Sequence, residues 1–221
     1  MVAKSDADRK RRASRIADRL IQTYPDARCR LNFSTPFELL VATILAAQCT
    51  DDKVNEVTAK LFRRANTPEA FARMRLATLE AAVRPTGFFR NKAKAVQNMS
   101  RMLLDEFGGK VPRDMDQLVR LPGVARKTAN VVRAAAFGLP AIITDTHFIR
   151  LSRRMGLTQN EDPAKIEADV AAMLPQDRWS AFSHAMLFHG RAVCEAKKPK
   201  CDACAVADEC PSAFKFPHFR K

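Results

Sequence analysis

Apolar side chains recur along this chain at the spacing of α-helices. Ser5 to Thr23 has the pattern of a basic amphipathic helix, and Pro25 closes it. Thr35 to Glu38 supplies an N-cap threonine, a proline at the first helical position and a glutamate three residues after the cap. The apolar residues that follow keep helical spacing on one face as far as Gln48. The first fifty residues therefore predict two helices.

Further helices are predicted downstream, and no strand is. Thr67-Pro68 and Asp162-Pro163 each join an N-cap residue to a proline at the next position, which marks a helix start. No segment sustains the alternation of period two that is typical of a half-buried strand. We therefore expect an all-α fold, with other helices over 52–65, 88–106, 124–137, 146–155 and 177–188.

Composition places the chain among globular proteins. Its 221 residues suffice for one large domain or two small ones, and 47% of them are hydrophobic and 28% charged. The longest apolar run, about Leu39 to Ala47, is shorter than the ~20 residues that a membrane span needs. The charges near the N-terminus have no apolar stretch behind them, so we expect no secretory signal, no membrane partner and a cytoplasmic protein, associated with the nucleoid if bacterial.

The charge balance indicates a polyanionic partner. The chain carries 38 Lys and Arg against 24 Asp and Glu, a net charge of +14. The excess positive charges repel one another unless a polyanion neutralises them. Nucleic acid is the leading candidate, an anionic membrane surface is the second, and a merely solvated basic surface is the third. Basic residues cluster in the first helix, over 84–101, over 120–133 and at Lys197, Lys198 and Lys200, which favours a shared phosphate-binding surface.

Four cysteines predict a metal centre. Cys194, Cys201, Cys204 and Cys210 follow the spacing C-x6-C-x2-C-x5-C. Disulfides are not expected in a chain without an export signal, whereas four thiolates in a short polar segment suit soft metal ions and iron–sulfur clusters. Structural zinc sites usually bring two close pairs, so zinc is a weaker alternative, and a chance group of thiols is a third. The lysines between the first two cysteines form either a rigid phosphate contact or a solubilising loop.

A tight turn between two predicted helices is the most specific local pattern. From Leu121 to Thr128 one helix ends at a turn that contains Gly123 and the next helix starts at once, so its backbone N–H groups can hold a phosphate oxygen. The pattern resembles the helix-hairpin-helix of DNA repair proteins, with Ala125 in place of the usual second glycine. Asp145, eighteen residues beyond Lys127, is by itself most simply the N-cap of the helix that follows.

Taken together, these motifs resemble endonuclease III, a bifunctional DNA glycosylase of the helix-hairpin-helix and Gly/Pro…Asp superfamily. The resemblance covers about four fifths of the chain and includes Asn32-Phe33-Ser34, His189-Gly190-Arg191, the hairpin and the four cysteines. It implies that Lys127 is the nucleophile and Asp145 its partner. A carboxylate can stabilise positive charge on the sugar as the N-glycosidic bond breaks, and a neutral amine can form a Schiff base that permits β-elimination. The alternative for the lysine is a plain phosphate contact.

The resemblance also implies that a base leaves the duplex. The target base must be flipped out before either residue can reach it. Gln48 would enter the gap, Phe88 or Phe89 would stack between bases of the other strand, and Arg90 and Lys92 would hold phosphates. The alternative for the two phenylalanines is packing in the core.

The implied architecture is two helical lobes with a DNA-binding cleft between them. Residues 29–139 would form a six-helix barrel that contains the hairpin. Residues 1–28 and 140–221 would form the second lobe around a [4Fe–4S] cluster held by the four cysteines. Lys127 would come from the first lobe and Asp145 from the second.

The implied activity is excision of oxidised pyrimidines from damaged double-stranded DNA by a monomer, followed by strand cleavage 3′ to the abasic site. The turn residues Gly123, Ala125 and Arg126 would grip the DNA backbone. Adenine-mismatch glycosylases of the family lack the lysine and add a C-terminal recognition domain. This chain has Lys127 and ends 11 residues after Cys210, which favours the bifunctional branch.

Three other interpretations stay open. The first is a mismatch thymine or uracil glycosylase of the same superfamily. The second is a DNA-binding paralogue in which the alanine in the hairpin has weakened or abolished activity. The third, more distant, is a zinc-finger-type binding module.

Overall fold

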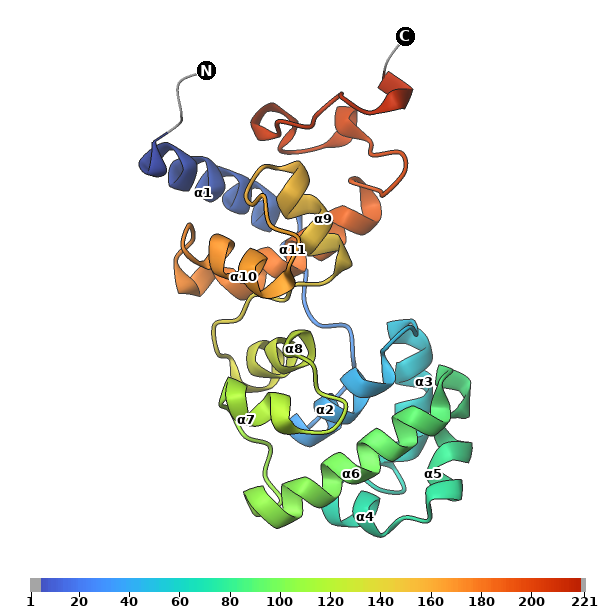
Figure 1. The fold of residues 1–221 in the computed structure, drawn as a ribbon. Helices are drawn as coiled ribbons and strands as arrows, with labels where there is room; N and C mark the ends of the chain where they lie inside the picture. Colours follow the sequence, from blue (N-terminus) through green and yellow to red (C-terminus); the bar gives the residue numbers. More distant parts are fainter. Residues whose placement is uncertain (1–4, 220–221) are drawn as a thin grey trace. The chain divides into compact units, whose positions relative to one another are not determined.

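The structure is a computed structural model that describes residues 5–219, and every regular element in that range is an α-helix or a short 3-10 turn (Figure 1). The all-α prediction is therefore confirmed. Contacts within the chain divide it into two units. One unit is Cys29–Leu139, and the other joins the residues up to Arg28 to those from Pro140 onward.

The Cys29–Leu139 unit is built around one buried helix. Its helices are α2 (Pro36–Leu45), α3 (Asp51–Phe62), α4 (Pro68–Arg73), α5 (Leu76–Val83), α6 (Phe89–Phe107), α7 (Met115–Arg120) and α8 (Arg126–Phe137), with a 3-10 turn, η1 (Arg84–Thr86), before α6. Helix α2 contacts α3, α6 and α8. Eight of its ten residues are buried, so burial extends well beyond the one apolar face that the sequence predicted, to nearly every side of the helix.

Side-chain caps explain most of the helix starts in this unit. Thr35, Thr50, Thr67 and Asp114 each accept a hydrogen bond from the backbone N–H three residues on. The starts predicted at Thr35 and Thr67 are confirmed. Helix α5 was not predicted, because Arg75 stands at its N-cap and makes no side-chain cap hydrogen bond.

The second unit packs α1 and α9 against α11, with α10 against α9. Its helices are α1 (Asp6–Thr23), α9 (Thr146–Arg154), α10 (Pro163–Ala171) and α11 (Trp179–Ala192), and 3-10 turns η3 (Cys201–Ala203), η4 (Ala207–Glu209) and η5 (Pro217–Phe219) follow. Helix α11 contacts α1 and α9, and α9 contacts α10. The predicted apolar positions Ile16 and Leu20 of α1 are fully buried in this core. No helix in the described part of the chain is long and apolar enough to cross a bilayer.

We expect the aromatic pair at the centre of the second unit to contribute strongly to its stability. Phe148 and Phe182 are fully buried, with their rings at 76° and 5.9 Å apart. Phe148→Ala leaves a cavity and should lower the free energy of unfolding by about 3–5 kcal/mol. Urea titration followed by the fluorescence of Trp179, the single tryptophan, measures it. Leu76→Ala, at an exposed position of the other unit, is the control, and an equal loss in both variants would contradict the assignment.

Candidate functional site

The predicted hairpin is present between α7 and α8. Leu121 and Val124 are buried on either side of the turn, and the Val124 N–H donates to the Leu121 carbonyl at 3.0 Å. Gly123 has φ +80°, and a Cβ at this position would lie 2.9 Å from the Cβ of Ala95. Only glycine fits this combination of a left-handed backbone and a close approach.

Helix α8 begins without a side chain at its cap. Its N-cap residue is Ala125, with φ −80° and ψ 166°, an extended conformation that any residue adopts. The methyl group therefore causes no backbone strain here, but it also makes no hydrogen bond to the first turn of α8. Lys127 lies in that first turn and is exposed. The positive end of the helix, with its free N–H groups, favours an anion beside this turn.

Four predicted DNA-contact residues line one hollow within the Cys29–Leu139 unit. They are Gln48, Phe88, Lys92 and Gly123, and Ile44, Ala47, Asn91 and Ala95 complete the lining. Gln48 has φ +52° and Phe88 has φ +47°. Non-glycine residues in the left-handed region cost free energy and occur preferentially at functional sites. Nothing in the sequence pattern predicted this strain.

The two phenylalanines of the predicted wedge have different surroundings. The side chain of Phe88 is 64% exposed at the N-cap of α6. Phe89 packs against the core of its unit, and the guanidinium carbons of Arg84 and Arg90 lie 6.0 Å and 5.1 Å from the centre of its ring. Phe88 is therefore the ring available to a partner, whereas Phe89 supports the segment.

Lys92 corrects one prediction. Its side chain is buried, and its Nζ donates to the carbonyls of Leu45 at 2.8 Å and Thr86 at 2.7 Å. Burial lowers the pKa of Lys92. The expected phosphate contact is wrong for this arrangement, because the ammonium joins the end of α2 to η1, the two segments that lead to Gln48 and Phe88. The neighbouring residues in the sequence do not indicate this role, because the buried surroundings of Lys92 form only when the chain folds.

Asp145 lies in the second unit as the N-cap of α9. Its Oδ1 accepts a hydrogen bond of 2.7 Å from the Phe148 N–H, so the simple capping role is real. Burial lowers the pKa of both His147 and His184, and the charge of Asp145 opposes that shift in each. The two imidazoles beside Asp145 therefore favour the neutral form.

The four predicted ligand cysteines surround one cavity of the second unit. Cys194, Cys201, Cys204 and Cys210 line one hollow that is partly open to solvent, and all four are free thiols. Within the described residues, no group of three His, Cys, Asp or Glu side chains is arranged to hold a single metal ion. Burial raises the pKa of Cys204 to about 11 and also raises that of Cys210, so these thiols ionise only beside a compensating positive centre.

Polar side chains position the first and third of these cysteines. Arg154 donates to the Sγ of Cys194 at 3.4 Å and to the carbonyls of Glu195 and Ala196 at 2.7 Å and 2.6 Å. The Nε2 of His189 lies 3.3 Å from the Sγ of Cys204, while its Nδ1 lies 3.1 Å from the hydroxyl of Tyr24. Burial lowers the pKa of His189 to about 4, so this imidazole is neutral.

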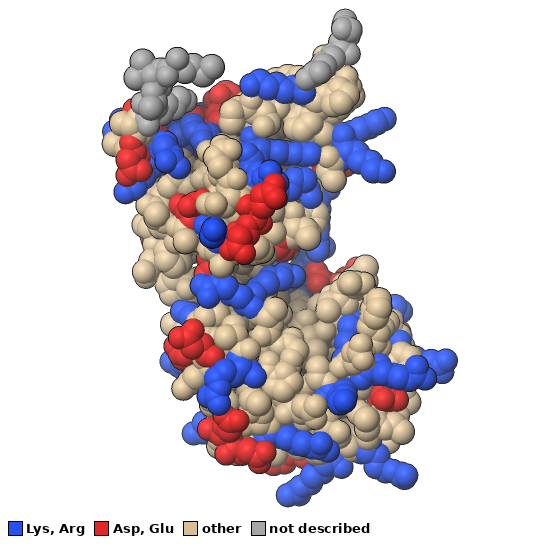
Figure 2. Space-filling model, in the orientation of Figure 1, with Lys and Arg blue, Asp and Glu red and all other residues tan. Residues whose placement is uncertain are grey.

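The lysines of the cysteine loop divide into two kinds. Lys197 and Lys198 are exposed. Lys200 is also exposed, but it forms an ion pair of 2.8 Å with Glu195 and donates to the Ala192 carbonyl at 3.2 Å. Figure 2 shows that Lys and Arg are spread over the visible face of both units, with acidic residues in small groups between them.

Comparisons with known proteins agree on one group. A family model for HhH-GPD superfamily base excision DNA repair proteins matches residues 41–176. Endonuclease III of Synechocystis sp. is 51% identical over 208 residues, which cover 94% of this chain and 95% of that protein. Endonuclease III of Bacillus subtilis is 44% identical, with 87% and 89% covered. A solved structure of a non-covalent endonuclease III–DNA complex is 42% identical with a TM-score of 0.90, covering 96% of this chain and 99% of that chain.

We expect the substitution of Lys92 to lower the stability of the protein. Lys92→Met leaves the Leu45 and Thr86 carbonyls without their buried donor, which should lower the free energy of unfolding by about 1–3 kcal/mol. Urea titration followed by far-UV circular dichroism measures the change. Lys94→Met, at an exposed position of the same helix, is the matched control. A Lys92→Met protein as stable as the control would contradict the buried contacts.

Proposed function

The chain belongs to the HhH-GPD superfamily of base excision DNA repair proteins and to its endonuclease III family, and we propose that it excises oxidised pyrimidines from duplex DNA. The protein is a DNA glycosylase with AP lyase activity, as its sequence indicated. A silent DNA-binding paralogue is not favoured. The observation that carries the proposal is the exposed Lys127 in the uncapped first turn of α8.

Lys127 is proposed as the nucleophile, and the Schiff base that it forms carries the second step. Its neutral amine attacks C1′ of the damaged nucleotide, the N-glycosidic bond breaks, and its electron pair leaves with the base, which takes up a proton. The amine–sugar adduct opens to a protonated Schiff base. Removal of the 2′ proton then expels the 3′ phosphate oxygen, which cleaves the strand 3′ to the abasic site. Lys127 is exposed in the first turn of α8, directly after the turn whose N–H groups can hold a phosphate, and this position supports the role.

Asp145 is proposed as the carboxylate that acts on the same nucleotide. As the N-glycosidic bond weakens, positive charge grows on the sugar, and a fixed carboxylate stabilises it. The hydrogen bond from the Phe148 N–H holds that carboxylate in one orientation at the start of α9. Because the two neighbouring histidines favour the neutral form, they do not neutralise Asp145 by pairing with it as cations.

Gln48 and Phe88 are proposed as the residues that enter the duplex. Flipping a base leaves a gap in the stack, and side chains that fill it stabilise the open state. Both residues are exposed, line the same hollow and stand in strained backbone conformations. Rigid presentation of this kind supports insertion, since a flexible loop would lose more conformational entropy on binding.

The DNA backbone is proposed to contact three basic regions. In the first, backbone N–H groups of the turn from Gly123 to Arg126 would hold a phosphate at the start of α8. Arg90 would contact a second phosphate beside the wedge, and Lys197 and Lys198 a third on the cysteine loop. Lys200 has its local partners, so its contribution is secondary. The partner is double-stranded DNA with damaged bases or abasic sites, bound by a monomer in the cytoplasm.

The four cysteines are proposed to hold a [4Fe–4S] cluster. Four thiols line one cavity, and only Cys201 and Cys204 form a close pair in sequence, whereas structural zinc sites usually bring two close pairs, so this ligand set fits a four-iron cluster better than a single zinc. Arg154 would donate to one of the sulfurs, and hydrogen bonds of this kind stabilise thiolate ligands. The bound cluster supplies a rigid core that fixes the fold of a loop with little regular structure.

Borohydride trapping tests the nucleophile. On duplex DNA with one abasic site, the parent protein should form a covalent adduct, because borohydride reduces the Schiff base to a stable amine. Lys127→Gln should abolish the adduct, and Lys110→Gln, at an exposed position of the same unit, should leave it unchanged. Adduct formation by Lys127→Gln at the parent's level would contradict the assignment.

Paired substitutions test the wedge. Phe88→Ala removes an exposed ring and should slow excision of an oxidised pyrimidine about tenfold or more without loss of stability, since stacking is worth about 1–3 kcal/mol per base. Phe89→Ala should instead lower the melting temperature, because its ring packs in the core. Single-turnover excision rates and thermal denaturation separate the two effects. Unchanged excision by Phe88→Ala would exclude the ring from insertion.

A further inference from the structure

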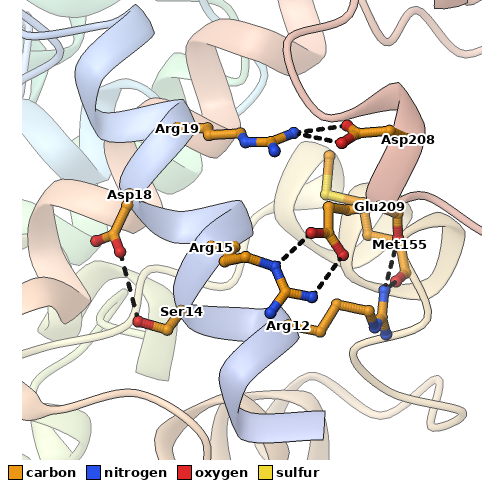
Figure 3. Close-up of polar contacts among 8 residues, drawn as sticks. All are labelled: Arg12, Ser14, Arg15, Asp18, Arg19, Met155, Asp208 and Glu209. Carbon is orange, nitrogen blue, oxygen red and sulfur yellow. Dashed lines mark hydrogen bonds and ion pairs between the residues drawn. The ribbon is translucent and has the colours of Figure 1, made fainter. Parts of the chain in front are cut away.

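Arginines of the first helix hold the end of the cysteine loop. The Nη1 of Arg12 donates to the carbonyls of Met155 at 2.7 Å and Glu209 at 2.9 Å (Figure 3). Its Nη2 donates to the Gly156 carbonyl at 2.7 Å. One half-buried guanidinium thus joins three elements: α1, the C-terminal end of α9 and the turn η4 immediately before Cys210.

These carbonyls have few other donors available to them. Met155 is the C-cap of α9, and Gly156 follows it, so their carbonyls lie where a helix leaves its last acceptors unpaired. A cation at the C-terminal end of a helix also interacts favourably with the helix dipole. The guanidinium of Arg12 therefore pairs the carbonyls at the end of α9 and also binds the Glu209 carbonyl.

Two more arginines on the same face of α1 extend this contact. Arg15 forms a two-pronged ion pair with Glu209, whose side chain is only 14% exposed. Arg19 donates to both carboxylate oxygens of Asp208 at 2.6 Å and 2.7 Å. Figure 3 shows the three arginines reaching from α1 toward the same turn. Their spacing of three and four residues places them on one side of the helix.

Close packing carries this contact to the fourth cysteine. A Cβ on Gly156 would lie 3.0 Å from the Cγ of Pro211 and 3.5 Å from the Nη2 of Arg12, so no side chain fits between them. Pro211 follows Cys210 directly, and the Sγ of Cys210 lies 3.4 Å from the Arg154 carbonyl near the end of α9. The position of Cys210 is thereby fixed on both sides.

We propose that Arg12, Arg15 and Arg19 form a clasp that positions Cys210 as an iron ligand and sets how tightly the chain retains its cluster. The inference rests on the proposed [4Fe–4S] cofactor. Between Cys201 and Cys210 the chain has only short 3-10 turns, whose backbone hydrogen bonds join residues three apart and leave the end of the loop to be held by contacts with the rest of the unit. The first helix supplies that restraint from the other end of the sequence, and these arginines are positioning residues with no contact to the reacting atoms.

The clasp has a buried part and an exposed part that respond differently to salt. The Arg15 and Arg19 side chains are 52% and 41% exposed, and ion pairs at such positions weaken as salt screens them. Arg12 is bonded to backbone carbonyls in a less exposed position, so its contribution persists at high ionic strength. Salt should therefore loosen the loop only in part, whereas loss of Arg12 should release it.

Iron retention tests the proposal on the full-length protein purified with its cluster. After addition of an iron chelator in air, iron content and the absorbance near 400 nm are followed over time. Arg12→Met keeps the apolar stem but removes the three hydrogen bonds, and we expect about 10- to 100-fold faster iron loss, the scale found for groups that position metal ligands. Arg11→Met, whose ion pair lies within α1 to Asp8, is the matched control and should lose iron at the parent's rate.

A charge exchange separates the clasp from general damage to the helix. Arg15→Glu places like charges against Glu209 and should accelerate iron loss, and the double variant Arg15→Glu with Glu209→Arg should restore retention. Equal iron loss from Arg12→Met and Arg11→Met, or no rescue by the exchanged pair, overturns the clasp. A parent protein without iron or the 400 nm band overturns the cofactor assignment itself, which distinguishes the two failures.

Discussion

The tight turn at Gly123 is the constraint on which the proposed chemistry depends. A side chain there would meet Ala95 at 2.9 Å, and the positive φ excludes most residues in any case. Because the turn is so short, α8 begins at once, with an alanine at its cap, and Lys127 falls in its first turn. The same backbone geometry that leaves N–H groups for a phosphate therefore also places the exposed Lys127 in the first turn of α8, beside that phosphate site.

A rigid interior holds two other residues of this unit in strained backbone conformations. Gln48 and Phe88 both stand in the left-handed region, which is costly unless the surroundings impose it. Helix α2 is buried on nearly every side, and Lys92 links its last residue to the turn before Phe88. A buried ammonium bonded to two carbonyls thus holds together the segments that present both residues. In the second unit, Arg12 of α1 and Arg154 of α9 hold the cysteine loop in the same way, through hydrogen bonds to its carbonyls.

Local chemistry made much of this molecule predictable from sequence. Caps at Thr35 and Thr67, the glycine of the hairpin and the cysteine spacing all act through neighbouring residues, so the all-helical class and the family followed directly. Contacts between residues far apart in the sequence could not be predicted in this way. The sequence placed Lys92 among phosphate ligands and the arginines of α1 on a phosphate-binding surface. Their partners, 47 and 197 residues away in the case of Leu45 and Glu209, exist only after folding.

The most direct test of the central claim locates the covalent bond in the unaltered protein. The parent is trapped with borohydride on abasic-site DNA, the DNA and protein are digested, and mass spectrometry identifies the peptide that carries the reduced sugar. The account predicts a single modified residue, Lys127, at the start of α8. A modification on any other lysine or on the terminal amine would contradict it.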